Sequence, residues 1–555
     1  MKKLLFLFLA LFLAETSAAQ KIHILFSGKN KVENELIDSL SYQKKHENIK
    51  SINKEVELFS DKLLNLGYID HQISPINKKN DSLYQLDIQL NKRTHFIHIY
   101  IGRNSILKTL NNYNYTSDTI TIPINKIEFF FNESLSLLEK KGYSLAKLKL
   151  INFKKQQNSL TASLKIESGK IRTLNEIVIN GIEKFPEGIK INSNRLYSSK
   201  TYTQESLKKI EKEFDSYRFV KQTKPPELLF TTDSTKVYVY LEKAKANKFD
   251  GFIGFTNDKK NNFLLTGYLD VILLNTLNKG EDITVFWKSD GNNQKTFTTG
   301  IGLPYLFKSP IGIKANLNIF KKDSIFQNTK INLDVGYLFK YNSRLYLGYQ
   351  STESSAIQGN TSQLIQDFKN KFVTSNYEFL DANTSNLLFP EKTKLNLKAG
   401  LGARKSALTT VNQLYISLDL SHTFYWNSKN NLQLKSNHYY LKSKEYLSSE
   451  LYRFGGINSI RGFNENSLQA NFFSSLLTEY RYVLSPQIYM HSILDFGYYK
   501  DDSISQKEQL LGLGFGFGLA TKNGIINLVY ANGSTKEQSV KLSNSIVQIS
   551  FKTQF

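Results

Sequence analysis

The residue types that carry covalent chemistry are absent from this chain or scattered along it. There is no cysteine, and therefore no thiol nucleophile and no thiolate metal site. The eight histidines are dispersed. The closest pair, His95 and His98, falls on an expected strand, where a spacing of three puts the two rings on opposite faces. With no Gly-x-Ser-x-Gly turn either, the sequence predicts no enzyme, no metal site and no cofactor.

The stretch from Arg453 to Phe463 is different, because it is too rich in glycine and polar residues to be a strand. Gly455 and Gly456 form an expected hinge, since a backbone without Cβ atoms can adopt positive φ or pass close to another segment. Arg461 follows. In an all-β membrane protein, an ordered loop that carries an arginine requires a carboxylate partner inside the barrel. A surface hairpin with a chance arginine is the alternative, and the surrounding chain has to decide between them.

The N-terminus predicts export. Met1-Lys2-Lys3 gives a positive start, Leu4 to Ala14 an apolar core, and small residues lead to an expected cleavage after Ala19. Residues 1–19 are therefore a predicted secretory signal peptide. A membrane anchor is the alternative, but the apolar run is too short to span a bilayer.

The net charge of +23 would suggest nucleic acid in a cytosolic protein. Export removes that partner, and the lysines are scattered singly, so we expect no nucleic acid. Anionic lipid headgroups or solvation of exposed faces explain the charge better. Aromatic residues make up 13% of the chain, which suits a protein rich in β-strands.

A repeat organises the N-terminal part. Gly67-Tyr68 and Gly142-Tyr143 lie 75 residues apart, and each ends a segment with helical periodicity, 56–66 and 127–141. A looser third copy has its helix around 203–217. Each helix is expected to follow an opening strand (21–26, 94–101 and 172–180) and to precede further strands (68–76 with 83–90, 144–153 with 159–167, and 236–243). An ordinary α+β domain with accidental similarity is the alternative.

From about Asp250 the periodicity changes to alternation. Segments of roughly ten residues are separated by turn residues such as Asn278-Lys279-Gly280, which is typical of a transmembrane β-barrel. We expect about sixteen strands. In one of them, Leu511 to Leu519, every second residue is glycine, which leaves room inside the barrel for the long loop. A soluble β-sandwich is the rival architecture.

Asp495 is the expected partner of Arg461. It is flanked by Leu494 and Phe496, so if those two side chains face lipid, the carboxylate faces the lumen. There it can form a bidentate, charge-assisted bond with the guanidinium. We expect this pair to hold the loop inside the barrel.

Several motifs resemble one family. The tandem units that end helices in Gly-Tyr resemble POTRA domains. Ile460-Arg461-Gly462-Phe463 resembles the V-R-G-F motif of outer-membrane β-barrel assembly factors of the BamA/TamA type, with Ile460 where valine is usual. Leu494 to Gly497 resembles the acidic strand motif that receives the arginine, and Glu479-Tyr480-Arg481 another recurring element. The chain is therefore similar to this family over nearly its whole mature length.

The resemblance implies an α+β fold of tandem POTRA repeats (β-α-α-β-β), followed by a transmembrane antiparallel β-barrel. The expected domains are the signal peptide 1–19, POTRA-like units at 20–93, 94–168 and 169–246, and a barrel at 247–555 with the lumen-inserted loop 443–470. Arg461, Gly462, Phe463, Glu479 and Asp495 are the implied loop anchor.

The resemblance also implies a function. Unfolded β-barrel clients would bind the periplasmic domains and enter the membrane by opening the seam between the first and last barrel strands. Expected seam residues are Ile253, Phe255, Ile549, Phe551 and Phe555. The implied location is the outer membrane of a Gram-negative bacterium, with the N-terminal domains in the periplasm. Outer-membrane lipids and assembly lipoproteins or an inner-membrane partner would be further contacts.

Two alternatives remain. A two-partner secretion transporter shares POTRA domains, barrel and arginine loop, but exports a soluble partner through the pore. It usually resembles two POTRA units behind a plug helix, whereas this chain has three units and no evident plug helix. A passive porin or receptor is the other alternative, although it has no use for tandem periplasmic units. Within the assembly family, three units favour an accessory, TamA-like member over the principal factor.

Overall fold

A computed structural model describes residues 22–103, 105–109, 115–116, 118–156, 159–257, 263–289, 294–323, 325–357, 364–382, 386, 388–407, 409–521, 524–537, 539 and 545–554. The expected signal peptide and Phe555 lie outside these residues. The chain divides into two compact units, residues 1–172 with 201–204, and residues 173–200 with 205–555. The first unit contains two α/β modules, and the second contains a third module and the barrel.

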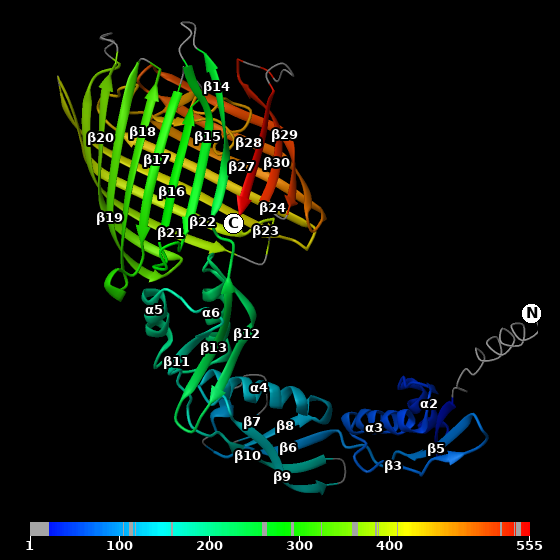
Figure 1. Cartoon of the computed structure of the whole chain (residues 1–555). Helices are drawn as coiled ribbons and strands as arrows, with labels where there is room; N and C mark the ends of the chain where they lie inside the picture. The colour runs from blue at the N-terminus through cyan, green and yellow to red at the C-terminus, as the bar shows by residue number, and fades with distance from the viewer. Residues whose placement is uncertain are drawn as a thin grey trace, which may run out of the picture. The chain divides into compact units, whose positions relative to one another are not determined.

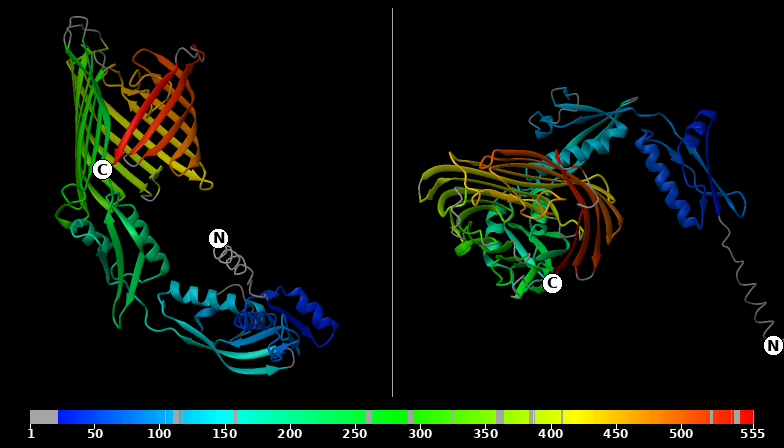
Figure 2. Two further views of the ribbon diagram at one scale, coloured as in Figure 1. Left: turned by 45° about the vertical axis from the view of Figure 1, so that its right-hand side comes forward. Right: turned by 90° about the horizontal axis from the view of Figure 1, so that it is seen from above.

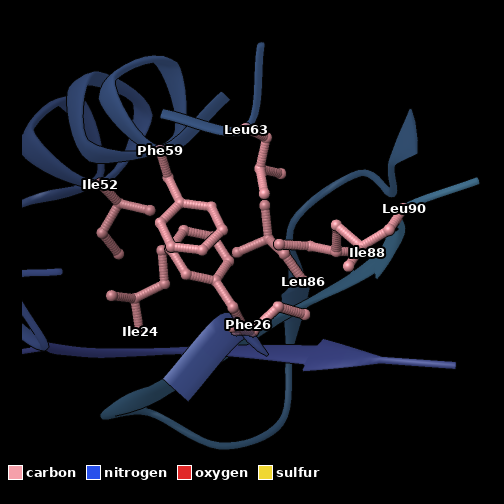
Figure 3. Packing of buried hydrophobic residues seen from close by; sticks show 9 residues of the cluster. Ile24, Phe26, Ile52, Phe59, Leu63, Leu86, Ile88 and Leu90 are labelled. Atoms are coloured by element: carbon pink, nitrogen blue, oxygen red, sulfur yellow. The ribbon is translucent and has the colours of Figure 1, made fainter. Parts of the chain in front are cut away.

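The first module packs one long helix against a small sheet. Its elements are β1 (Ile22–Gly28), α2 (Lys31–Ser39), β2 (Lys45–His46), α3 (Ile49–Asn65), β3 (Gln72–Ile73), β4 (Asn77–Lys78) and β5 (Leu83–Gln89). Phe59 and Leu63 of α3 point onto the sheet, where the Phe59 ring stacks on Phe26 with centroids 4.4 Å apart (Figure 3). The strand expected over 68–76 is broken into the short pieces β3 and β4, around Pro75. A proline has no N–H for the sheet, which favours such a break.

The second module has β6 (Phe96–Tyr100), the 3-10 helix η2 (Ile106–Thr109), β7 (Tyr115–Thr116), β8 (Thr119–Pro123), the 3-10 turn η3 (Ile124–Lys126), α4 (Ile127–Lys140), β9 (Lys147–Gln156) and β10 (Ser159–Glu167). Its sheet order is β7-β8-β6-β10-β9. Between β6 and α4, the described residues hold η2 and a hairpin in place of a first α-helix, which differs from the predicted β-α-α-β-β order.

The two Gly-Tyr pairs end α3 and α4 in the same way. Gly67 and Gly142 have φ of +95° and +93°. The next N–H, of Tyr68 or Tyr143, donates back to Leu63 O at 3.0 Å or to Leu138 O at 2.9 Å. This is the Schellman arrangement, in which glycine supplies the left-handed residue past the helix end. The repeat seen in the sequence is therefore a repeated helix stop.

The third module packs against the barrel. It contains β11 (Glu176–Asn180), α5 (Glu187–Tyr197), α6 (Gln204–Asp215), β12 (Val220–Phe230) and β13 (Thr235–Lys243). The Asn192 amide donates to Lys308 O at 2.9 Å, and the Tyr217 ring meets Tyr341 edge-on at 4.9 Å. The Tyr217 hydroxyl donates to Glu213 at 2.9 Å. Burial and the Glu213 carboxylate raise the pKa of Tyr217 well above its usual value, so it remains a neutral donor.

Sixteen antiparallel strands form a closed barrel within the described residues (Figure 1). They are β14 (Lys248–Asn257), β15 (Phe263–Leu274), β16 (Asp282–Ser289), β17 (Gln294–Leu303), β18 (Ile311–Lys322), β19 (Phe326–Lys340), β20 (Ser343–Ala356), β21 (Phe368–Ala382), β22 (Glu391–Ser406), β23 (Thr410–Tyr425), β24 (Asn430–Lys442), β27 (Phe472–Ser485), β28 (Ile488–Asp501), β29 (Gln506–Thr521), β30 (Gly524–Thr535) and β31 (Ile546–Gln554). The predicted fold, tandem POTRA-like modules before a barrel of about sixteen strands, is confirmed.

Alternation along the strands sorts the side chains between lipid and lumen. On β19 and β20, exposed apolar residues form a continuous outer belt in which Val335 pairs with Leu347. The side chains between them, such as Asn332 and Asp334, are buried and polar and face the lumen. An apolar outer face around a polar interior is the pattern of an outer-membrane barrel. Across the described part of the chain, no α-helix is both long and apolar enough to cross a bilayer.

The seam of the barrel is short. β14 pairs with β31 only from Lys248 to Asp250, through three residue pairs, whereas β14 pairs with β15 through ten. Beyond these pairs β14 and the red strand β31 diverge (Figures 1 and 2). The paired part of the seam therefore lies before Ile253 and Phe255, the residues of the first strand that were expected there. Ile253 and Phe255 pair with β15 and have no register partner among the described residues of β31.

The outer belt generates a stability prediction. Leu347 lies at its centre and is 65% exposed. A lysine at the midplane of the bilayer costs about 2–4 kcal/mol. We therefore expect Leu347→Lys to lower the free energy of unfolding by about this amount in urea titrations of the protein in lipid vesicles.

Phe307→Lys is the matched control, because Phe307 is 91% exposed in the turn between β17 and β18, outside the belt. It should change the free energy of unfolding by less than about 0.5 kcal/mol. Equal effects of the two substitutions would mean that Leu347 does not face lipid.

Candidate functional site: the arginine loop inside the barrel

The loop from residue 443 to 470 is a short ribbon that folds into the barrel. Two strands, β25 (Tyr452–Phe454) and β26 (Leu468–Ala470), pair in antiparallel fashion. Gly455 and Gly456 follow β25 with φ of +108° and +89°. A Cβ on Gly455 would lie 2.3 Å from Asn464 O, so only glycine fits there. The double glycine thus lets the chain turn at the end of the ribbon.

Aromatic packing holds this ribbon on the barrel wall. The Phe454 ring stacks on Phe473 of β27 with centroids 4.0 Å apart, and meets Tyr499 of β28 edge-on at 5.3 Å. The Tyr452 ring stacks on Tyr439 of β24 at 4.6 Å. The ribbon is therefore attached to three neighbouring strands before its tip is reached.

Arg461 at the tip contacts two carboxylates. Its Nε donates to Asp495 Oδ2 at 2.8 Å and its Nη2 donates to Asp495 Oδ1 at 2.5 Å, a bidentate pair. Its own backbone N–H also donates to Asp495 Oδ2, at 3.1 Å. Nη1 donates to Glu479. The side chains of Arg461 and Asp495 are 4% and 0% exposed, so this ion pair is buried.

A second arginine balances the charge. Arg481, two residues after Glu479 on the same face of β27, donates to Glu479 through Nε at 2.8 Å and Nη2 at 2.6 Å. It also donates to Gln433 of β24, and its guanidinium lies 4.6 Å from the centre of the Phe389 ring. Two arginines and two carboxylates thus form one neutral network. Neutrality matters because an unpaired charge is costly at such a buried site.

Glycines on the wall make room for the tip. A Cβ on Gly512 would lie 2.4 Å from Arg461 O, and one on Gly533 would lie 2.4 Å from Gly462 O. A Cβ on Gly497 would lie 2.7 Å from the Ile460 side chain. The tip therefore sits directly on the backbones of β28, β29 and β30. The other glycines of β29 serve neighbouring side chains, since a Cβ on Gly516 would meet His491 and one on Gly518 would meet Tyr489.

Strand alternation aims the acidic partner inward. On β28, Leu494 and Phe496 are exposed on the outer face, and Asp495 lies between them on the inner face. The structure thus brings together the five residues expected at the anchor. Phe463 joins them by packing on the cluster around Phe454 and on Gly533. The expected seam residues lie elsewhere: Ile549 and Phe551 are exposed on the outer face of β31, and the side chains of Ile253 and Phe255 lie outside the described residues.

Sequence reasoning missed several loop contacts. Arg404 on β22 bonds to Glu450 at the base of the loop, and Lys288 on β16 bonds to Glu465. Alternation could have placed Arg404 and Lys288 in the lumen, but nothing in the sequence links them to acidic residues so far along the chain. Arg481 could have been found, because it shares the face of Glu479 at a spacing of two. Over the described residues there is no cluster of His, Asp and Glu suited to a metal ion.

Comparisons with known proteins were made for the whole chain. The family model described as "Haemolysin secretion/activation protein ShlB/FhaC/HecB" matches residues 392–519. No curated protein is significantly similar in sequence. The solved structure of CdiB from Escherichia coli is similar over 91% of this chain and 98% of that chain, with 12% identity and a TM-score of 0.51.

Two further structures are similar. CdiB from Acinetobacter baumannii matches with 14% identity and a TM-score of 0.51, over 81% of this chain and 85% of that chain. BamA from Haemophilus ducreyi lacking POTRA domains 1-3 matches with 13% identity over 81% of this chain and 97% of that chain. Its TM-score of 0.45 is too low to support an assignment.

These findings confirm the expected fold and location, and they correct the expected family. The chain has the fold of outer-membrane β-barrel transporters that carry periplasmic POTRA domains, as expected from its export signal and alternating strands. The names of the matches describe no enzyme, in agreement with the prediction of none. The placement in the BamA/TamA family is wrong, because the matching family model is that of ShlB/FhaC/HecB. The arginine loop could not distinguish the BamA/TamA family from two-partner secretion transporters, because both groups were expected to carry it.

Removal of Arg461 should reveal the strength of the anchor. Arg461→Ala leaves Asp495 buried without its cation, which typically costs about 3–5 kcal/mol when no water enters. We expect urea titrations in lipid vesicles to show a loss of about 2–4 kcal/mol in the free energy of unfolding, since lumen water lowers the penalty.

Lys500→Ala is a suitable control, because the exposed Lys500 pairs at 2.8 Å with the half-buried Asp502, and such a surface pair should contribute less than about 1 kcal/mol. The double variant Arg461→Ala/Asp495→Ala should be more stable than the sum of the two single losses implies. Strictly additive losses would show that the two side chains do not act as a pair.

Proposed function

We propose that this protein is a two-partner secretion transporter, which moves a soluble partner protein through the lumen of its barrel to the cell surface. The observation that carries the proposal is the match of residues 392–519 to a family of secretion and activation proteins. This segment runs from β22 into β29 and contains Arg461, Glu479 and Asp495. The similarity therefore lies on the wall and the loop that would meet a chain in transit.

The lumen is suited to an extended polypeptide. Its wall carries hydrogen-bonding groups over several strands: Lys398 donates to Asn332 at 3.0 Å and to Gln350 at 3.1 Å, and the Tyr415 hydroxyl donates to Gln350 at 2.8 Å. Lys314 pairs with Glu378 at 2.7 Å. Such a wall can exchange its hydrogen bonds with the backbone of a passing chain, whereas lipid cannot.

The third module supports a role in delivery. It is attached to the base of the barrel by the Asn192 amide and by the contact between Tyr217 and Tyr341. A partner bound by the third module would therefore be released next to the barrel mouth. In this proposal the partner is one exported protein, and outer-membrane lipids surround the barrel.

The direct test is removal of the protein from its host. We expect one large protein to disappear from the secreted fraction and the cell surface, and to accumulate or be degraded in the periplasm, because its pore is missing. Quantitative proteomics of medium, envelope and periplasm measures this. Re-expression of the native chain is the control. A general loss of outer-membrane barrels with an unchanged secreted fraction would contradict the proposal.

A disulfide across the seam should show whether the exported partner passes through the lumen or between the two seam strands. Phe249 and Thr553 are register partners across the seam, and the native chain has no cysteine that could interfere. We expect Phe249→Cys/Thr553→Cys, oxidised to a disulfide, to secrete the partner at the native rate, because the partner does not pass between β14 and β31.

The reduced form of the same variant is the matched control. Secretion that stops on oxidation and resumes on reduction would show that the strands must part, and would contradict passage through a closed barrel.

A further inference from the structure

A second cluster of polar contacts, separate from the tip, holds the start of the loop on the barrel wall. It is formed by Arg404, Gln413 and Glu450, and we call it the base clamp. Arg404 of β22 donates through Nη1 to Glu450, and the two side chains are 1% and 2% exposed. Gln413 of β23 donates to Glu450 Oε2 at 2.8 Å, and the backbone N–H of Leu447 donates to Oε1 at 2.9 Å. Arg404 Nη1 also donates to Glu445 O, at 3.2 Å. One carboxylate of the loop is thus fixed to two neighbouring strands of the wall.

The same part of the loop reaches β18 and β19. The Asn328 amide of β19 donates to Ser449 O at 2.6 Å. The Arg453 guanidinium lies 5.4 Å from the centre of the Phe320 ring and 5.2 Å from that of Phe326. These contacts hold the base on the part of the wall formed by β18 to β23.

Base and tip are held on different parts of the ring. The tip lies on β27 to β30, and Glu465 beyond it bonds to Lys288 on β16. In the ring order, β23 and β27 are separated by β24, and β30 and β16 are separated by β31, β14 and β15. A segment that contacts all these strands has to cross the lumen, and in the view from above the loop lies inside the ring (Figure 2). A chain in transit therefore meets this loop.

The guanidinium of Arg404 in the base clamp is less well satisfied than that of Arg461 at the tip. Arg404 Nε, Gln413 Oε1 and Ser449 Oγ are buried without a hydrogen-bond partner in the described protein, as is Asn328 Oδ1. The charged atoms of Arg461, Glu479 and Asp495 include no such atom. A partly satisfied polar network contributes less than a complete one, because each buried, unpaired group offsets part of the gain. The ion pair of Arg404 is thus less completely hydrogen-bonded than that of Arg461.

We propose that Arg404, Gln413 and Glu450 are positioning residues that keep the loop closed across the lumen, and that release of this clamp, with Arg461 still bound to Asp495, opens the pore. That the pore then admits an exported partner rests on the proposed function; the opening itself does not. In the open state the base swings away from β22 and β23, while the tip remains on β27 to β30. The anchor at Arg461 fixes the loop, and the clamp at Arg404 sets how often the lumen is free.

Conductance of the purified full-length protein in planar lipid bilayers measures the opening without any partner. Glu450→Gln keeps the shape of the side chain and removes its charge, so that, of its ion pairs in the described protein, Arg404 retains only the longer contact with the Glu445 carboxylate, at 3.9 Å. We expect the open probability to rise about tenfold, a shift of about 1.4 kcal/mol in the equilibrium. Glu353→Gln is the matched control, since it removes an exposed ion pair with Lys369, at 3.6 Å on the outer face, that involves neither the loop nor the lumen, and it should leave the conductance unchanged.

Two more variants test whether the clamp residues act by positioning the loop or whether their substitution damages the fold. Arg404→Gln/Glu450→Gln replaces the ion pair by a neutral amide pair, and the open probability should return toward the native value. Asn328→Cys/Ser449→Cys, oxidised, should hold the pore closed, and reduction should release it.

The proposal is overturned if Glu450→Gln conducts like the native protein, if the double glutamine variant conducts at least as much as Glu450→Gln, or if the oxidised pair still opens. Secretion by the oxidised pair is measured in cells as a separate readout. If conductance behaves as expected but no partner is ever exported, the clamp stands and the proposed function fails.

Discussion

The structure depends on one buried ion pair, between Arg461 on a loop and Asp495 on the barrel wall. Removing two charges from water is costly, and their attraction offsets that cost only when the geometry is good and the remaining donors and acceptors are satisfied. Here the guanidinium is bidentate on Asp495, the backbone N–H of Arg461 adds a third bond, and Glu479 accepts from the far side. The result is an attachment that fixes position more than it adds stability.

The barrel is arranged around this attachment. The tip can reach Asp495 only because Gly497, Gly512 and Gly533 leave the wall bare at three neighbouring strands. The loop turns back on itself only because Gly455 and Gly456 adopt positive φ. Alternation along β28 then turns Asp495 inward while its neighbours face lipid. Glycine placement, strand register and charge pairing are thus three aspects of one arrangement, which fixes a loop across a polar lumen.

Much of this follows from the sequence, because the relevant signals are local. A period of two predicts which side of β28 carries Asp495, and glycine after an amphipathic run predicts the helix stops at Gly67 and Gly142. Other features depend on contacts far apart in the chain. The pairing of Arg404 with Glu450 has no local signal, and neither has the register of the seam, which closes at Lys248 to Asp250. The family was predicted wrongly for a related reason: POTRA domains, barrel and arginine loop were expected in both assembly and secretion proteins, and the count of three POTRA-like units favoured the wrong group.

The most direct measurement of the central claim is cross-linking to a partner stalled in transit. A photoreactive residue at Asn332 lies on the inner face of β19, and one at Ile549 lies on the outer face of β31. With a partner halted by a tightly folded domain at its trailing end, passage through the lumen predicts cross-links from Asn332 and none from Ile549. Cross-links from Ile549 alone would contradict the account, because the partner would then be leaving the barrel through its seam.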